Sequence, residues 1–280
     1  MRALLALCLL LIAQAQAREL KLAAWNLSWL TLRPEGSPDL PPGVQPKREE
    51  DIATLASYAR RLNADVVAFS EVDGPEIAAR IFPPDRWQIH ITQDHVVQRA
   101  GFAVANDIAV TENPDLTALD IYPKARFHLR SAADITLHFG GLDLRLLAVH
   151  LKSGCSRTRL PDPATPACVT LLRQTQPLHD WIAARGQDAF VVLGDFNRWM
   201  EGDDFLTRLA PDGVLLRPDA RLSNPCWGGS GFLDHILPGG AARDLMVQGS
   251  LRVLRYDETS PEMRERLSDH CPISIKLTTP

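Results

Sequence analysis

Apolar segments of strand length recur along this chain, and polar residues stand where they end. The segments are residues 20–26, 64–69, 144–150 and 190–197. The polar residues at or just after their ends are Asn26, Glu71, His150, Asp195 and Asn197. Buried strands end at the edge of a sheet, where loops begin and ligands can enter. The pattern therefore predicts a single polar site assembled from distant parts of the sequence.

Helical and further strand patterns lie between these segments. Apolar residues at helical spacing predict helices over about 47–62 and 169–185. Additional strands are expected at 87–93, 101–105, 133–139, 232–237 and 267–277, with turns at Asn113-Pro114 and Gly140-Gly141. This interspersion indicates an α+β fold with mixed sheets rather than a pure parallel barrel.

The first seventeen residues have the pattern of a signal peptide. One arginine is followed by an apolar stretch from 3 to 13 and then by Ala15-Gln16-Ala17. Lipidation at Cys8 is disfavoured, because Leu7 before it is larger than a lipoprotein signal requires. We expect export to the periplasm or the medium, with one domain over 18–280. The net charge of −4 argues neither for nor against a polyanionic partner.

Four cysteines remain beyond that segment, namely Cys155, Cys168, Cys226 and Cys271. An even number in an exported protein indicates disulfides, and three pairings are possible. We favour Cys155 with Cys168, which would close a loop rich in Pro, Thr and Arg, and Cys226 with Cys271. A zinc site is the weaker alternative, because no two cysteines have the close spacing of a zinc knuckle.

Oxygen ligands suited to a hard cation occur among the polar residues. Glu71 and Asp269 supply carboxylates and Asn26 supplies an amide oxygen, a set that suits Mg²⁺ or Mn²⁺ better than zinc. Each residue alone would more often be a solvated loop residue, a helix cap or a turn former. Because all three adjoin apolar strands, we predict a metal site.

Two histidines are candidates for proton transfer or for donation to a phosphate, namely His150 and His270. Asp234 is the expected partner of His270, since His235 would point to the opposite face of a strand. Asp195 and Asn197 are two residues apart and would share a face, as a pair that positions water and phosphate requires.

The segment Ser268-Asp269-His270 can place two side chains in one site only in a particular backbone conformation. On a regular strand Asp269 and His270 would face opposite ways, so both can serve one site only if the chain bends there. We expect a disulfide from Cys271 to Cys226 to hold that bend.

Basic residues supply further candidates. Lys152 follows His150 by two residues and could bind phosphate, although an ordinary exposed lysine fits the sequence equally well. The arginines could form a rim for a nucleic acid backbone, which is a weak signal, and Arg130 is a weak candidate for substrate binding. The members of the rim would be Arg126, Arg130, Arg157, Arg159, Arg173 and Arg198.

These motifs resemble the endonuclease/exonuclease/phosphatase (DNase I-like) superfamily over nearly all of the chain beyond residue 17. They are Trp25-Asn26-Leu27, Ser70-Glu71-Val72, His150-Leu151-Lys152, Gly194-Asp195-Phe196-Asn197, Leu233-Asp234-His235 and Ser268-Asp269-His270. The resemblance implies a four-layer sandwich of two packed mixed sheets flanked by helices. It departs from the family at Ser70, where glutamine commonly precedes the metal-binding glutamate.

The resemblance also implies roles for the site residues. Glu71 would bind the metal with Asn26 and Asp269. The catalytic residues would be His150, Asp195, Asn197, Asp234 and His270.

We therefore expect an exported, divalent-metal-dependent phosphoric ester hydrolase, a nuclease acting on DNA or RNA. The alternatives are a phosphatase or a phosphodiesterase for sphingomyelin or other lipid esters, and a non-catalytic binding module. A monomer with a nucleic acid substrate and no stable membrane insertion is expected.

Overall fold

The computed structural model describes residues 18–201, 204–229 and 231–279, so the predicted signal peptide over 1–17 lies outside it. Its strands are β1 (Glu19–Leu30), β2 (Val66–Val72), β3 (Trp87–Ile91), β4 (Arg99–Ala105), β5 (Ala109–Glu112), β6 (Ala133–Phe139), β7 (Leu142–His150), β8 (Phe190–Asp195), β9 (Asp234–Gly239), β10 (Arg252–Val253) and β11 (Ile273–Thr278). Its helices are α1 (Glu49–Leu62), α2 (Pro75–Ile81), α3 (Pro166–Ala183), α4 (Phe205–Leu209), α5 (Ala242–Leu245) and α6 (Pro261–Arg266), with 3-10 turns at Thr117–Leu119 and Cys226–Gly228.

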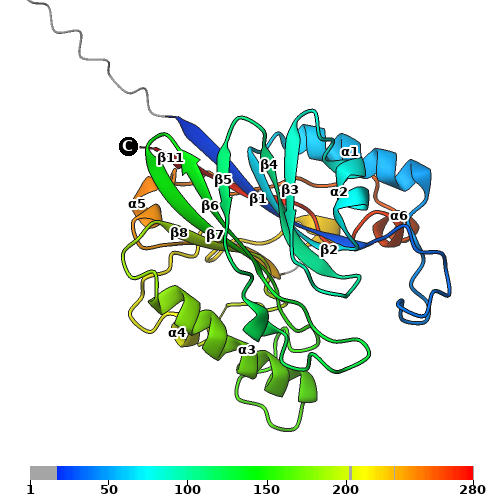
Figure 1. Cartoon of the computed structure of the whole chain (residues 1–280). Helices are drawn as coiled ribbons and strands as arrows, with labels where there is room; N and C mark the ends of the chain where they lie inside the picture. Colours follow the sequence, from blue (N-terminus) through cyan, green and yellow to red (C-terminus); the bar gives the residue numbers. More distant parts are fainter. Residues whose placement is uncertain (1–17, 202–203, 230, 280) are drawn as a thin grey trace, which may run out of the picture.

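The strands form two mixed sheets (Figure 1). One is six-stranded in the order β10-β11-β1-β2-β4-β3, with β1 and β2 parallel. The other is five-stranded in the order β5-β6-β7-β8-β9, with β7 and β8 parallel. Each sheet thus holds one parallel pair among antiparallel neighbours, and the two strands of each pair end at the same edge.

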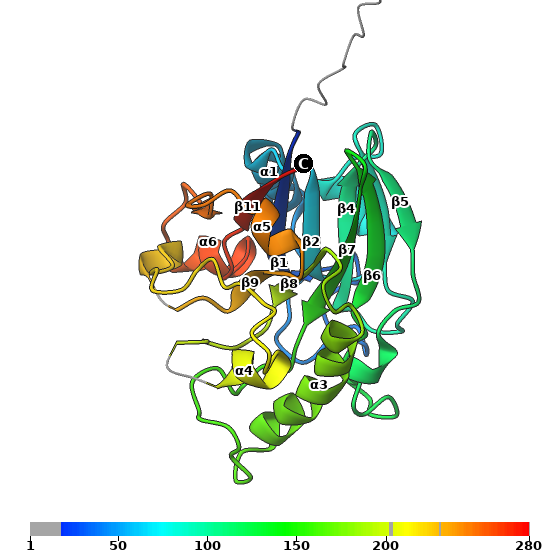
Figure 2. The ribbon, with the colours of Figure 1, turned by 90° about the vertical axis from the view of Figure 1, so that its left-hand side faces the viewer.

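Side-chain alternation on the strands explains why these sheets pack into layers. On β1, Leu22 and Ala24 belong to the core between the two sheets, while Ala23 and Trp25 pack on the other face against α1 and α2. The outer face of the second sheet packs against α3 and α4. Figure 1 shows α1 and α2 on one side of the two sheets and α3 and α4 on the other, and Figure 2 shows α1 and the pair α3 and α4 at opposite ends of the molecule, which confirms the predicted four-layer sandwich.

Most of the predicted strands differ from the observed ones by a few residues at one or both ends, and three of the differences concern the site. The first strand continues past Asn26 to Leu30 through an irregular stretch. The strand predicted at 232–237 begins only at Asp234. The last begins at Ile273 rather than 267, because α6 occupies 261–266 and Pro272 has no N–H to give to the ladder.

Among the described residues, no helix is both long and apolar enough to span a membrane.

Candidate active site

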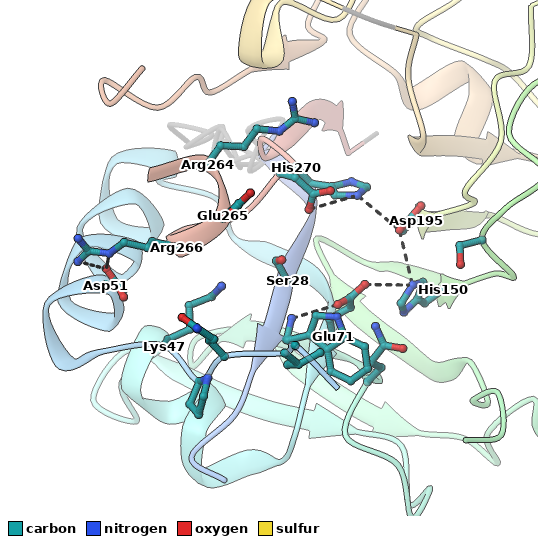
Figure 3. Close-up of a pocket in the computed structure, with 18 of the residues that line it drawn as sticks. Ser28, Lys47, Asp51, Glu71, His150, Asp195, Arg264, Glu265, Arg266 and His270 are labelled. Atoms are coloured by element: carbon teal, nitrogen blue, oxygen red, sulfur yellow. Dashed lines mark hydrogen bonds and ion pairs between the residues drawn. The ribbon is translucent and has the colours of Figure 1, made fainter. Parts of the chain in front are cut away.

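The polar strand ends meet at one edge of the two sheets (Figure 3). Within the second sheet, Asp195 on β8 lies opposite both His150 on β7 and Asp234 on β9. Asn26 on β1 connects the sheets: its Nδ2 donates to Asp195 Oδ2 at 2.9 Å and to Glu71 Oε1 at 3.1 Å. One amide therefore holds two carboxylates that come from different sheets.

A cavity of about 950 Å³ opens at this edge. On one side it is lined by residues that the sequence predicted, namely Glu71, Arg130, His150, Asp195, Asn197, Asp269 and His270. The rest of the lining comes from residues 43–48 and α6, together with Ser28, Trp29, Asp51, Gln98 and Ser153. Both carboxylates and cations line it, as a site for a metal ion and a phosphate ester requires.

Glu71 owes its orientation to an irregular backbone. Its φ is 61°, in the left-handed region that costs a non-glycine residue on the order of 1–3 kcal/mol. The pairing of β2 with β4 shifts register across this residue, between Phe69 and Val72. The Glu71 carboxylate is then held by Asn26 and by the Trp29 backbone N–H, which donates to Oε2 at 3.0 Å. Strain at this residue thus presents a carboxylate to the cavity.

Asp195 is a buried carboxylate with several donors. The Asn197 backbone N–H donates to Oδ1 at 2.7 Å, and the Asn197 side-chain amide donates to Oδ2 at 3.1 Å. Burial raises the pKa of Asp195 to about 7, and the nearby Asp234 carboxylate adds to this, although His270 acts in the opposite direction. Asp195 can therefore exchange a proton near neutral pH.

His270 carries a stable positive charge. Its Nδ1 lies 2.6 Å from Asp234 Oδ2, the partner expected from the sequence, and its Nε2 lies 3.9 Å from Asp195 Oδ2. Burial acts to lower the pKa of His270, but the carboxylates of Asp234 and Asp195 outweigh it and raise the pKa well above its usual value. The imidazolium thus presents Nε2–H toward both Asp195 and Asp269, each 3.9 Å away.

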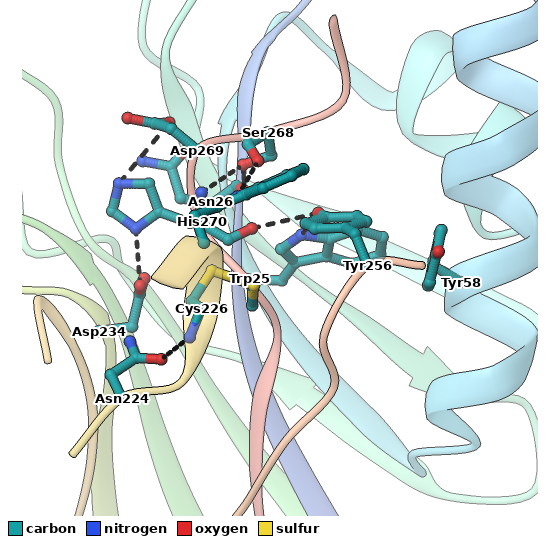
Figure 4. The surroundings of a disulfide bond; sticks show 12 residues. Trp25, Asn26, Tyr58, Asn224, Cys226, Asp234, Tyr256, Ser268, Asp269 and His270 are labelled. Atoms are coloured by element: carbon teal, nitrogen blue, oxygen red, sulfur yellow. Dashed lines mark hydrogen bonds and ion pairs between the residues drawn. A yellow bond between two sulfur atoms is a disulfide. The ribbon is translucent and has the colours of Figure 1, made fainter. Parts of the chain in front are cut away.

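The loop that carries His270 is fastened on several sides (Figure 4). Ser268 Oγ donates to the Asn26 carbonyl at 2.7 Å and accepts from the His270 backbone N–H at 3.0 Å. Tyr256 donates from its hydroxyl to the His270 carbonyl at 3.1 Å. The expected bend is therefore present, in a loop before β11 rather than within a strand.

Both predicted disulfides are present, Cys155–Cys168 and Cys226–Cys271. The second joins the loop before β9 to the residue after His270, so it ties together the segments that carry Asp234 and His270.

Removing that disulfide should reduce both stability and activity. For a sequence separation of 45 residues, loss of Cys226–Cys271 in a double serine variant should lower the free energy of unfolding by about 4 kcal/mol. It should also lower kcat, since the His270 loop loses a tether. Loss of Cys155–Cys168, with a separation of 13, should cost about 3 kcal/mol and leave kcat close to wild type. Urea unfolding and steady-state kinetics check this; equal kcat values for the two variants would contradict it.

His150 differs from His270 in charge. Its Nε2 lies 3.6 Å from both Glu71 Oε1 and Asp195 Oδ2, and its Nδ1 has no hydrogen-bond partner among the described residues. Burial, then the positive charges of Arg130 and His270, lower the pKa of His150 well below its ordinary value. One histidine is thus neutral and the other charged, on either side of Asp195.

The residues present fit a hard divalent cation. Glu71 and Asp269 line the same cavity, and Asp269, whose side chain is 53% exposed, accepts no hydrogen bond from a described residue. Asn26 differs from expectation, because its Oδ1 accepts from the Ser28 N–H at 2.8 Å and its Nδ2 faces the carboxylates. In this conformation Asn26 orients Glu71.

A second group of possible ligands lies beside it. Single ligand atoms of Asp195, Asp234 and His270 all lie within 4.8 Å of one another. A metal-binding histidine must be neutral, however, and His270 is held charged by its bond to Asp234. These three residues are better suited to proton transfer than to metal binding.

The predicted basic residues lie in different environments. Four of them are exposed and do not line the cavity, namely Arg126, Arg157, Arg159 and Arg173. Lys152 does not line the cavity; its ammonium donates to the Ser153 carbonyl at 3.0 Å. Arg130 does line it, but is buried and donates to the carbonyls of His150 and Leu151. Arg198 is wholly buried and donates to the Cys155 and Thr158 carbonyls, so its placement on a surface rim is wrong.

The sequence did not identify the far side of the cavity. Lys47 and Arg48 line it from the loop before α1, and Arg264 and Arg266 from α6. The available signal was the position of Lys47-Arg48 in the connection from β1 to α1, near the edge where β1 ends.

Comparisons with known proteins agree with this arrangement. The model of the Endonuclease/Exonuclease/phosphatase family matches residues 23–270. No curated protein matches. Similar solved structures include truncated Caenorhabditis elegans TDP2, with 13% identity over 93% of this chain and 98% of that chain and a TM-score of 0.60.

Two further solved structures are similar over most of their length. Danio rerio TDP2 complexed with a single-strand DNA product is 14% identical over 93% of this chain and 99% of that chain, with a TM-score of 0.57. A mannosyl-6-phosphatase of Bacteroides thetaiotaomicron is 13% identical over the same shares, with a TM-score of 0.58. At these identities the likeness concerns the fold.

Proposed function

Because the chain belongs to the endonuclease/exonuclease/phosphatase family and is a phosphoric ester hydrolase, we propose that it is a divalent-metal-dependent nuclease acting on DNA or RNA. The observation that carries the proposal is the arrangement around Asp195. A carboxylate with a pKa near 7 lies between a neutral and a charged histidine, in a cavity that Glu71 and Asp269 also line. Groups with such divergent pKa values suit proton transfer in hydrolysis.

Glu71 and Asp269 would hold Mg²⁺ or Mn²⁺, with Asn26 orienting Glu71. When bound, the ion supplies stabilisation of negative charge on the phosphoryl oxygens.

The side chains of the site would have separate roles in in-line hydrolysis. Water attacks phosphorus as the ester P–O bond breaks, Asp195 takes the proton of that water while Asn197 fixes the carboxylate, and the leaving oxygen takes a proton from solvent. His270 offers Nε2–H to a phosphoryl oxygen, and Asp234 maintains its charge. His150, whose Nε2 is 3.6 Å from the nearest carboxylates, donates to another phosphoryl oxygen.

Two observations support nucleic acid as the substrate. The cavity extends beyond the reacting groups to a wall with several cations, which suits a ligand with more than one phosphate. A protein of the same fold has been seen with a single-strand DNA product. A phosphatase is the second candidate, because a mannosyl-6-phosphatase also shares the fold.

A panel of substrates separates these candidates. We expect hydrolysis of DNA or RNA and of bis-p-nitrophenyl phosphate, and little release of phosphate from mannose 6-phosphate or of phosphocholine from sphingomyelin. Nicking of circular plasmid would indicate endonuclease action, and release of nucleotides from linear DNA only would indicate exonuclease action. Turnover of a monoester or of sphingomyelin without cleavage of nucleic acid would overturn the nuclease proposal.

We also propose that residues 1–17 direct export and that 18–280 form the catalytic domain. The two disulfides support this, since such bonds persist in oxidising compartments.

A further inference from the structure

Lys47 lies in the cavity wall on the side away from the reacting groups. It belongs to the loop that enters α1, and that loop lines the cavity over residues 43–48. Figure 3 shows Lys47 on the same side as Asp51, with Ser28 between it and the group of His150 and Asp195. A ligand that fills the cavity would therefore reach Lys47 beyond the bond that breaks.

The Lys47 ammonium has no direct partner in the protein. It makes no hydrogen bond or ion pair with any residue that the structure describes, although the carboxylates of Asp51, Glu71 and Asp269 attract it at longer range. Burial lowers the pKa of Lys47 to about 8, which these carboxylates only partly offset. A partly buried ammonium without hydrogen bonds costs free energy unless a ligand supplies an acceptor.

The other cations of the cavity are engaged or exposed. Arg266 donates from Nε to Asp51 at 2.9 Å, and Arg48 pairs with Glu50 at 3.6 Å. Arg130 donates to backbone carbonyls, while Arg264 is exposed to solvent. Lys47 therefore combines partial burial in the cavity with three unused N–H donors.

We propose that Lys47 binds a second phosphate of the substrate, the neighbour of the scissile phosphate along a nucleic acid strand. The inference deepens the proposed nuclease function and rests on it. Lys47 contributes to specificity: it distinguishes a strand with adjacent phosphates from an isolated phosphodiester, and the chemistry at the scissile phosphate does not require it.

Short oligonucleotides provide the test. A thymidine dinucleotide contains one phosphate and a trinucleotide contains two, so only the trinucleotide can place a phosphate beside the one that is cleaved. For wild type, kcat/KM should be higher for the trinucleotide. In Lys47→Gln the value for the trinucleotide should fall about tenfold, mainly through KM, since a hydrogen bond to a charged group is lost. The value for the dinucleotide should stay within about twofold of wild type.

Two further variants serve as controls. Lys47→Arg retains a cation with donors and should keep most of the preference for the trinucleotide. Lys276→Gln removes an equal charge from β11, where Lys276 pairs with Glu19 outside the cavity. This variant should leave kcat/KM unchanged for both oligonucleotides. Thermal unfolding should show all variants folded.

Three results would contradict the inference. An equal loss of kcat/KM for both oligonucleotides in Lys47→Gln would mean that Lys47 acts at the scissile phosphate or maintains the folded structure. An unchanged preference for the trinucleotide would exclude a contact with the second phosphate. If wild type cleaves neither oligonucleotide but hydrolyses bis-p-nitrophenyl phosphate, the nuclease proposal fails, and with it the inference that rests on it.

Discussion

Replacing His270 with Ala is expected to lower kcat on a phosphodiester by roughly 10²–10⁴-fold. His270 is held charged by Asp234, whose Oδ2 lies 2.6 Å from its Nδ1, and its Nε2 is directed toward Asp195. The substitution removes a positively charged donor that stabilises negative charge on the phosphoryl oxygens as the P–O bond breaks. Steady-state kinetics on bis-p-nitrophenyl phosphate measure the loss without dependence on contacts to nucleic acid.

The comparison variants separate chemistry from folding. His138→Ala changes an exposed histidine that pairs with Asp143 on the strand hairpin, and its kcat should equal that of wild type. Thermal unfolding of His270→Ala should show a folded protein, because the Ser268 and Tyr256 contacts to this loop use backbone atoms of residue 270, with a lowered midpoint because the buried Asp234 carboxylate loses its partner. If His270→Ala kept more than about a tenth of the wild-type kcat, the assignment of His270 would be wrong.

Replacing Glu71 with Gln should reduce the affinity for Mg²⁺ by at least about 100-fold. This loss is larger than is usual for a residue that only orients a metal-binding side chain. The carboxylate lines the cavity with Asp269 and is oriented by Asn26 and by the Trp29 N–H. Glutamine keeps the shape of the side chain but removes the charge that a hard cation requires. Isothermal titration calorimetry with MgCl₂ measures binding directly, and kcat should fall in parallel at low metal concentration.

Glu76 offers a matched control for this substitution. It is exposed in the first turn of α2, close in sequence but with its charge outside the cavity, so Glu76→Gln should bind Mg²⁺ as wild type does. Unchanged Mg²⁺ affinity in Glu71→Gln would refute the proposed ligand and would favour the cluster of Asp195, Asp234 and His270 as the metal site.

Local patterns in the sequence predicted mixed sheets and the edge at which the site lies, whereas the four layers were implied by the resemblance to the family. Alternation on β1 places Leu22 and Ala23 on opposite faces, and each face is buried against a different layer. The parallel pair β7 and β8 places His150 beside Asp195 once both segments are assigned as strands. The pairing of Cys226 with Cys271 followed from assigning Cys155 and Cys168 to the loop that they bracket, and both bonds are present.

The details that orient the side chains could not be predicted from such patterns. The left-handed backbone of Glu71 depends on a register shift between β2 and β4, which only the assembled sheet shows. Asn26 lies within β1 rather than at its end, and its amide donates to carboxylates instead of offering an oxygen to a metal.

Cations were the least predictable group. Arg130 and Arg198 suggested a surface rim by charge alone, yet both are buried, where they donate to loop carbonyls that need partners. Lys47 was not recognised, since a lysine before a helix is ordinarily solvated and only the packing of α6 across the cavity gives it a role.

The central claim, metal-dependent hydrolysis of nucleic acid at this site, is tested most directly by the cleavage of single-stranded DNA with and without metal. Purified protein should cleave a labelled oligonucleotide in Mg²⁺ or Mn²⁺, lose that activity in EDTA and regain it when excess Mg²⁺ is added, whereas Glu71→Gln should not regain it at the same Mg²⁺ concentration. Cleavage at an undiminished rate in EDTA, after prior removal of metal, would contradict the account.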